Sequence, residues 1–139
     1  MAETTRSEKL KRLVAVQRHL ERMTENELAD TTRKRNEVQQ SMQNVIEAIG
    51  SVDPVHQALS RHYADRYGRL TVKDNQLSGM QQLLEMQVLK ERTKADRLEA
   101  NMKEAREEED REAADEAIYD IVDQAFAAGT PASSKVQKP

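Results

Sequence analysis

Apolar residues recur at intervals of three and four over two long stretches of this chain, and a short turn-forming sequence separates them. The first stretch runs from Leu10 to Ile49, and the second runs from Leu59 to Ala105. Such intervals keep side chains on one narrow stripe of an α-helix. We therefore predict an all-α protein with two long helices, each carrying a heptad-like seam.

The two predicted seams differ in how apolar they are. The first weakens between Thr24 and Glu37, and the second contains several polar members. The first comprises Leu10, Leu13, Val16, Leu20, Met23, Leu28, Val38, Met42, Val45 and Ile49. The second comprises Leu59, Tyr63, Arg66, Leu70, Lys73, Leu77, Met80, Leu84, Val88, Glu91, Ala95, Leu98, Met102 and Ala105.

The sequence between the two stretches predicts where one helix ends and the next begins. Gly50 stands where a helix C-terminus favours a left-handed residue. Asp53 is placed to cap a second helix, and Pro54 fits its first position because no N–H is needed there. Upstream, Thr5 and Glu8 have the spacing of a capping box. The predicted elements are a helix over about 6–49, a turn over 50–53 and a helix over about 54–127.

A short turn between two seamed helices predicts an antiparallel coiled-coil hairpin. A turn centred near Val52 sets the expected register of the two helices. The expected cross-seam pairs are Leu28 with Leu77, Leu20 with Leu84, and Leu10 with Ala95. Within the second helix, Gly68 and the pair Ser78-Gly79 are expected to mark bends, and the chain could break near Gly68.

The second helix is predicted to overhang its partner beyond about Leu98. Residues 101–127 carry ten acidic and three basic side chains, and opposite charges spaced four apart support a helix there without a core. An apolar stripe returns over Ala117–Phe126. From Gly129 the sequence reads GTPASSKVQKP, and we predict that residues 128–139 form a disordered tail.

The composition argues against an enclosed active site. Hydrophobic residues make up 37% of the 139 residues, charged residues 34% and aromatic residues only 3%, which is too little for a wide core. Cysteine is absent, so disulfides, thiolate metal sites and cysteine nucleophiles are excluded. His56 and His62 are too far apart around a helix to hold one metal ion, and His19 is alone. We expect no catalytic residue, metal or cofactor.

Neither a membrane nor a nucleic acid is the expected partner. No apolar run approaches the roughly 18–20 residues that span a bilayer, and the N-terminal sequence lacks the apolar core of a signal peptide. We therefore expect a cytoplasmic protein that does not insert into membranes. Arg33, Lys34 and Arg35 form a short basic run, but the net charge of −3 argues against a duplex-binding footprint.

Two segments are candidate docking surfaces for a protein partner. One is the hairpin tip, where apolar residues and two tyrosines gather, although they could simply close the end of the coil. The other is the terminal stripe, a form that typically enters a groove on a partner, although it could fold back or self-associate. The candidate binding residues are Val45, Ile46, Ile49, Val55, Leu59, Tyr63, Tyr67, Ile118, Ile121, Val122 and Phe126.

These features together resemble one family. A chain that is nearly all antiparallel coiled coil, with a charged Met102–Glu116 segment and an overhanging second helix, is similar to the stalk proteins of type III export, FliJ of flagella and YscO of injectisomes. The resemblance implies paired termini in the pore of a hexameric export ATPase and a hairpin that contacts the export gate and substrate chaperones. It assigns Arg6–Leu20 and Lys90–Phe126 to the ATPase and Val45–Tyr67 to the gate.

We therefore expect a non-catalytic accessory of flagellar or related type III protein export. Two alternatives stay open. The first is a generic coiled-coil adaptor or a homo-oligomer, such as a homodimer, and the second is a nucleic-acid-binding helical arm.

Overall fold

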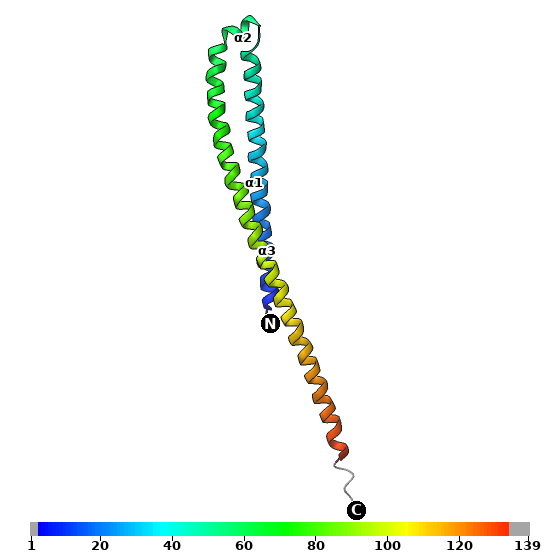
Figure 1. Ribbon diagram of the computed structural model, residues 1–139. Helices are drawn as coiled ribbons and strands as arrows, with labels where there is room; N and C mark the ends of the chain where they lie inside the picture. Colours follow the sequence, from blue (N-terminus) through cyan, green and yellow to red (C-terminus); the bar gives the residue numbers. More distant parts are fainter. Residues whose placement is uncertain (1–2, 134–139) are drawn as a thin grey trace, which may run out of the picture. The chain divides into compact units, whose positions relative to one another are not determined.

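The computed structural model describes residues 3–133, and within that range the regular structure is entirely α-helical (Figure 1). Helix α1 spans Arg6–Ile49, the short helix α2 spans Pro54–Ala58, and helix α3 spans Ser60–Ser133. Figure 1 shows α1 and α3 side by side near the turn, running in opposite directions. The predicted all-α helical hairpin is confirmed.

The helix starts follow the local chemistry that the sequence indicates. At the start of α1, the Glu8 amide N–H lies 3.3 Å from Thr5 Oγ1, and the Thr5 amide N–H lies 3.4 Å from Glu8 Oε2. At the start of α2, Asp53 Oδ1 accepts a hydrogen bond of 3.0 Å from the Val55 amide, and Pro54 is the first helical residue. Each cap satisfies backbone donors that have no partner inside the helix.

The end of α1 differs from the prediction at Gly50. No described glycine has a positive φ, so Gly50 is not a left-handed cap. Its N–H donates to Ile46 O at 3.1 Å, which continues the α-helical pattern, and the Ser51 N–H donates to Ala48 O at 3.2 Å. The last turn of α1 therefore ends with a 3₁₀-type hydrogen bond between residues three positions apart. This bond satisfies a terminal carbonyl without a left-handed residue.

The break in the second half of the hairpin lies at Leu59 rather than near Gly68. Leu59 separates α2 from α3, and its N–H donates to His56 O at 3.2 Å. Helix α3 then runs through Gly68 and Gly79 for 74 residues. A glycine costs about 1 kcal/mol in a helix interior, which a long continuous helix tolerates. The helix also continues to Ser133, six residues past the predicted end at 127, and residues 134–139 of the expected tail lie outside the described residues.

The chain divides into two compact units. We call residues 15–96 the tip unit, and residues 1–14 with 97–139 the terminal unit. In the tip unit, all buried residues fall on one strict three-four repeat on each helix, which half-buried residues complete. Other half-buried residues, such as Arg18, Glu25 and Thr71, lie beside this repeat. On α1 the seam residues of the repeat are Gln17, Glu21, Thr24, Leu28, Thr31, Arg35, Val38, Met42 and Val45. On α3 they are Tyr63, Tyr67, Leu70, Asp74, Leu77, Gln81, Leu84, Val88, Glu91 and Ala95.

The terminal unit continues the same repeat over a shorter length. Its seam residues are Ser7, Leu10 and Val14 on α1, and Leu98, Met102, Ala105 and Glu109 on α3. Ala105 is 3% exposed. The described side chains from Asp110 to Gly129 are all exposed, so the seam ends at Glu109.

The predicted seam is wrong over the first half of α1. Val16, Leu20 and Met23 were expected inside, but 60%, 42% and 47% of their surfaces are exposed. Leu13, in the terminal unit, is also exposed. Glu21 and Thr24 are buried instead, at 8% and 6%. Smaller errors of the same kind occur on α3, where Gln81 rather than Met80 faces inward, and at Ile49, which is exposed.

The predicted register is also wrong, by about two helical turns. Leu20 was expected beside Leu84, but Glu21 contacts Arg92 and Arg18 contacts Asp96. The reason is the connection between the helices. The turn, α2 and Leu59 together occupy residues 50–59, so the centre of the hairpin moves from Val52 to about residue 56 and every partner on α3 shifts toward the C-terminus.

Candidate functional site

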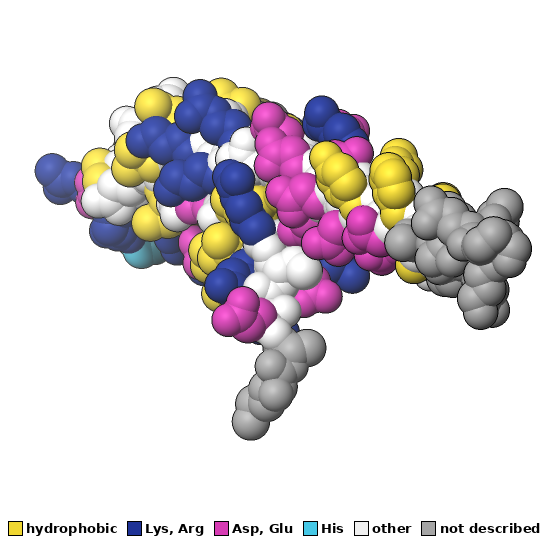
Figure 2. Space-filling view, turned by 90° about the horizontal axis from the view of Figure 1, so that it is seen from below, with side chains coloured by type: hydrophobic (Ala, Val, Ile, Leu, Met, Phe, Trp, Pro, Cys, Tyr) yellow, Lys and Arg dark blue, Asp and Glu magenta, His cyan; other side chains and the backbone are white. Residues whose placement is uncertain are grey.

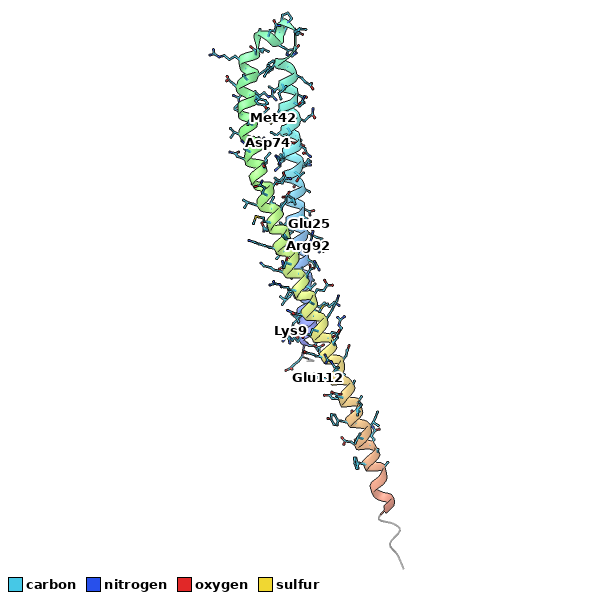
Figure 3. All side chains as sticks on the ribbon, viewed as in Figure 1. Lys9, Glu25, Met42, Asp74, Arg92 and Glu112 are labelled. Carbon is cyan, nitrogen blue, oxygen red and sulfur yellow. The ribbon has the colours of Figure 1, made fainter. Side chains whose placement is uncertain are left out.

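A network of charged side chains replaces apolar packing in the first half of the tip-unit seam. Arg92 donates through Nε to Glu21 at 3.0 Å. A terminal nitrogen of Arg92 donates to Glu25, also at 3.0 Å, and Figure 3 labels these two residues next to each other. Arg18 donates to Glu21 at 2.9 Å and to Asp96 at 2.8 Å. The hydrogen bonds from Arg18 and Arg92 lower the pKa of Glu21, which keeps this buried carboxylate ionised.

Further polar seam residues are paired across the helices in the same way. Arg35 donates to Asp74 at 3.1 Å and to Gln81 at 3.0 Å, and Gln17 donates to Glu91. In the terminal unit, the Ser7 amide donates to Glu109 at 3.0 Å, and the Ser7 hydroxyl and amide lower the pKa of Glu109. No buried side-chain polar atom in the described chain lacks a partner. The polar seam therefore specifies which residues face each other.

The two sides of the tip-unit hairpin have different chemistry. One side is formed by residues that directly follow seam residues, and we call it the paired flank. It contains Arg18, Glu25, Arg92 and Asp96, which join the network described above. In an antiparallel pair, the residues that directly precede seam residues lie together on the other side, which we call the open flank.

Cations gather on the open flank of α3 without ionic partners. Its members in the tip unit are His62, Arg66, Arg69, Lys73, Gln76, Met80, Leu83, Gln87, Lys90 and Lys94. All the cations in this set are exposed, and none forms an ion pair with another described residue. On α1, the open flank includes the exposed apolar residues Val16, Leu20 and Met23. The open flank of α1 also carries the exposed carboxylates of Glu27, Asp30 and Glu37. This side of the tip unit therefore presents apolar, basic and acidic groups.

Shallow grooves follow the open flank and do not enclose a substrate site. One groove of about 270 Å³ lies among Glu27, Asp30, Thr31, Lys34, Met80 and Leu84. A second of about 390 Å³ lies among Lys34, Glu37, Val38, Ser41, Leu70 and Lys73. A third of about 160 Å³ lies among Ser41, Asn44, Val45, Ala48, Tyr63 and Arg66. Adjacent grooves share Lys34 or Ser41, so they follow one another along the open flank.

The hairpin tip presents only part of the predicted binding set. Val45 is 5% exposed and packs in the seam, so its side chain does not face a partner, and Tyr63 and Tyr67 are half-buried seam residues. The Tyr63 hydroxyl lies 2.8 Å from His56 Nδ1, which fixes α2 against α3. The exposed apolar residues of the tip are Ile46, Ile49, Val52, Val55 and Leu59.

The predicted binding residues of the terminal stripe all lie on the surface. Ile118, Ile121, Val122 and Phe126 are exposed by 58%, 65%, 42% and 72%. Figure 2 shows acidic and hydrophobic side chains next to one another on this part of α3, beside the grey C-terminal residues. The sequence reasoning missed Met80 and Leu83 as surface residues, although each directly precedes a seam residue in the strict repeat.

Among residues 3–133, no three His, Asp or Glu side chains lie close enough together to bind a metal ion. Within the same range, no helix has the length and apolar character needed to cross a membrane. No protein-family model matches the chain, and comparisons with curated proteins and with solved structures found no significant match.

Proposed function

We propose that the protein acts without catalysis, as a cytoplasmic helical-hairpin accessory of flagellar or related type III protein export. The observation that carries the proposal is the part of α3 beyond Glu109. This part has no seam, yet it keeps an exposed apolar stripe from Ile118 to Val122 on an acidic helix. Such a helix binds a protein groove more readily than an anionic membrane, because its polar face is acidic.

A second apolar surface, at the turn of the tip unit, supports an accessory role. The side chains of Val52 and Val55 are 87% and 64% exposed. The Asp53 cap and the contact between Tyr63 and His56 hold this turn in place. A protein with two apolar docking surfaces joined by long helices can connect two partners. In the export proposal, the terminal stripe binds the export ATPase and the tip binds the export gate.

The experiment is a binding assay with purified export ATPase and the cytoplasmic part of the export gate from the same cell. Ile121→Asp combined with Phe126→Asp should abolish ATPase binding and leave gate binding unchanged. Val52→Asp combined with Val55→Asp should have the reverse effect. Gln124→Asp, which adds charge outside the apolar stripe, is the matched control and should bind both partners. If the unchanged protein binds neither partner while circular dichroism shows intact helices, the export role is wrong.

A second candidate function is favoured by the unpaired cations of the open flank. Arg66, Arg69 and Lys73 lie along one exposed face of α3 without anionic partners, as expected of a helical arm that contacts nucleic acid. Retention on heparin that falls steeply with added salt, and that is lost in the triple Glu variant of these residues, would favour this alternative over the export role. A general coiled-coil adaptor would bind neither heparin nor export components.

A further inference from the structure

One stretch of α3 in the tip unit is almost free of charge. Between Asn75 and Leu89 the one charged residue is Glu85, although 34% of the residues of the chain are charged. The seam side of this stretch is apolar at Leu77, Leu84 and Val88. The other sides carry large apolar side chains that are 53%, 69%, 59% and 63% exposed, namely Met80, Leu83, Met86 and Leu89. A helix that is apolar on all sides is normally buried on all sides, so we expect the outer side of this stretch to be covered.

Six exposed residues form a second three-four repeat along this part of α3, which we call the outer stripe. Each stands two positions after a seam residue, about 200° around the helix, so the outer stripe faces away from α1. It comprises Val72, Gln76, Gly79, Leu83, Met86 and Lys90. Gly79 leaves a gap in the stripe, because an added Cβ there would meet nothing within 4 Å. The gap and the exposed Leu83 are one helical turn apart, so the stripe carries a projecting side chain beside a space of the kind that could receive one.

The chemistry of the outer stripe selects an uncharged partner surface. A charge facing its central residues would lose its hydration without gaining an opposite charge. The terminal stripe does not meet this condition, because Asp120 and Asp123 flank Ile121 and Val122 in the sequence. The outer stripe of a second copy meets it. The leucine and the gap also exchange places under a two-fold rotation, so the surface is complementary to itself.

We propose that two copies of the chain pair through their outer stripes, with the two α3 helices antiparallel and the two-fold axis beside Gln81. Leu83 of each copy then enters the gap at Gly79 of the other. The contact extends about 27 Å along the helix at 1.5 Å per residue. The inference does not depend on the export role. The facing pairs, each formed twice, are Gly79 with Leu83, Gln76 with Met86, and Val72 with the aliphatic stem of Lys90.

The residues beside the outer stripe meet their own counterparts near the two-fold axis. On one side, Met80 lies against Met80 of the second copy. On the other side, Gln82 lies against Gln82 of the second copy, and two amides can bond each other because each carries donors and an acceptor.

The charges at the ends of the outer stripe favour the antiparallel direction. A parallel pair in register would place Lys90 on Lys90 and Arg69 on Arg69, and like charges opposite each other are repulsive. In the antiparallel pair, Lys90 faces Val72 instead. The nearest like charges are Arg66 and Lys94 of the second copy, which lie beyond the ends of the contact and stay in water.

Sedimentation equilibrium of the full chain tests the contact. Leu83→Glu combined with Met86→Glu should raise the dimer dissociation constant at least about tenfold, because it brings carboxylates to an uncharged centre. Leu20→Glu combined with Met23→Glu is the matched control, because it also replaces two exposed apolar residues of the tip unit. The control should dimerise like the unchanged chain. An unchanged chain that stays monomeric up to about 1 mM, or a dimer that the first variant leaves intact, would overturn the proposal.

Two glycines of α3 provide a second matched pair. An added Cβ meets nothing within 4 Å at Gly79 or at Gly68, so one copy of the chain tolerates a side chain at either position. Gly79→Leu should raise the dimer dissociation constant at least about tenfold, because the new side chain occupies the space that Leu83 of the second copy enters. Gly68→Leu should leave dimerisation unchanged. Equal dissociation constants for the two variants would show that the helices do not meet at Gly79.

Cysteine crosslinking tests the direction of the pair. The chain has no cysteine, so introduced thiols have no competitors. Gln82→Cys, beside the two-fold axis, should form a disulfide-linked dimer on mild oxidation. Val72→Cys should not, because the two copies of this position lie about 27 Å apart along an antiparallel pair. Rapid self-crosslinking of Val72→Cys would instead show parallel pairing and contradict the proposal.

Discussion

Two neighbouring leucines on α3 provide a sharp test of which residues form the seam. Leu84 is 8% exposed and faces α1, whereas Leu83 is 69% exposed on the open flank. The two substitutions Leu84→Ala and Leu83→Ala remove the same atoms from adjacent positions of one helix. Helix propensity changes equally in both, so the difference in stability between the two variants reports burial alone.

The expected cost of Leu84→Ala follows from the atoms that leave the seam. The substitution removes three carbon atoms that are almost fully buried, at about 0.8 kcal/mol for each buried CH₂ group. The cavity contribution should be small, because the groove formed with Thr31 and Met80 opens beside Leu84 and lets neighbours and water fill the space. We expect Leu84→Ala to lower the free energy of unfolding by about 2 kcal/mol, and Leu83→Ala by less than about 0.5 kcal/mol.

The assay is urea unfolding followed by circular dichroism at a protein concentration where the chain is monomeric. The midpoint should fall for Leu84→Ala while the slope with denaturant stays unchanged. An equal loss of stability in the two variants would mean that both leucines are buried to the same extent, and the described seam would then be wrong.

Three further predictions concern local features. The lowered pKa of Glu21 means that its ion pairs stabilise the fold fully above the ordinary value of 4.5, and that this contribution is lost as the pH falls through the lowered pKa. Glu21→Gln should therefore make the free energy of unfolding depend less on pH in the acidic range, and an unchanged pH profile would contradict the network. Asp53→Ala should cost about 1 kcal/mol in urea unfolding, because the Val55 amide loses its acceptor, while Asp53→Asn should cost much less. Gly68→Ala should raise stability by about 0.5–1 kcal/mol, because an added Cβ meets nothing within 4 Å and α3 is continuous there; a loss of stability would indicate a break.

Local features of the fold were predictable because they depend on residues close together in the chain. The caps at Thr5 and Asp53 need only side chains two or three positions away. The all-α hairpin followed from the repeat and from Pro54. By contrast, the register depended on how many residues the connection uses. The break at Leu59, which sets that number, has no glycine or proline of its own to mark it.

The seam of α1 was mispredicted for a different physical reason. Apolar pattern alone favours Leu20 over Glu21, because a carboxylate is costly to bury. Glu21 is nevertheless inside, because Arg92 reaches it from α3 and Arg18 from its own helix. Neither contact can be deduced from α1 until the register is known. The open flank could not be predicted for the same reason. Met80 and Leu83 can be assigned to the surface only after Gln81 and Leu84 have been assigned to the seam.

The hairpin connection also has a consequence for how the chain reaches its folded state. The Arg35–Asp74 contact joins residues 39 positions apart, whereas the Ser7–Glu109 contact joins residues 102 positions apart. Closing a longer loop costs more entropy, so the helices should associate first near the turn and zip toward the termini. Opening should proceed in the reverse order. Backbone amides of α1 near Val38 and Val45 should therefore exchange with solvent more slowly than those near Ser7 and Leu10.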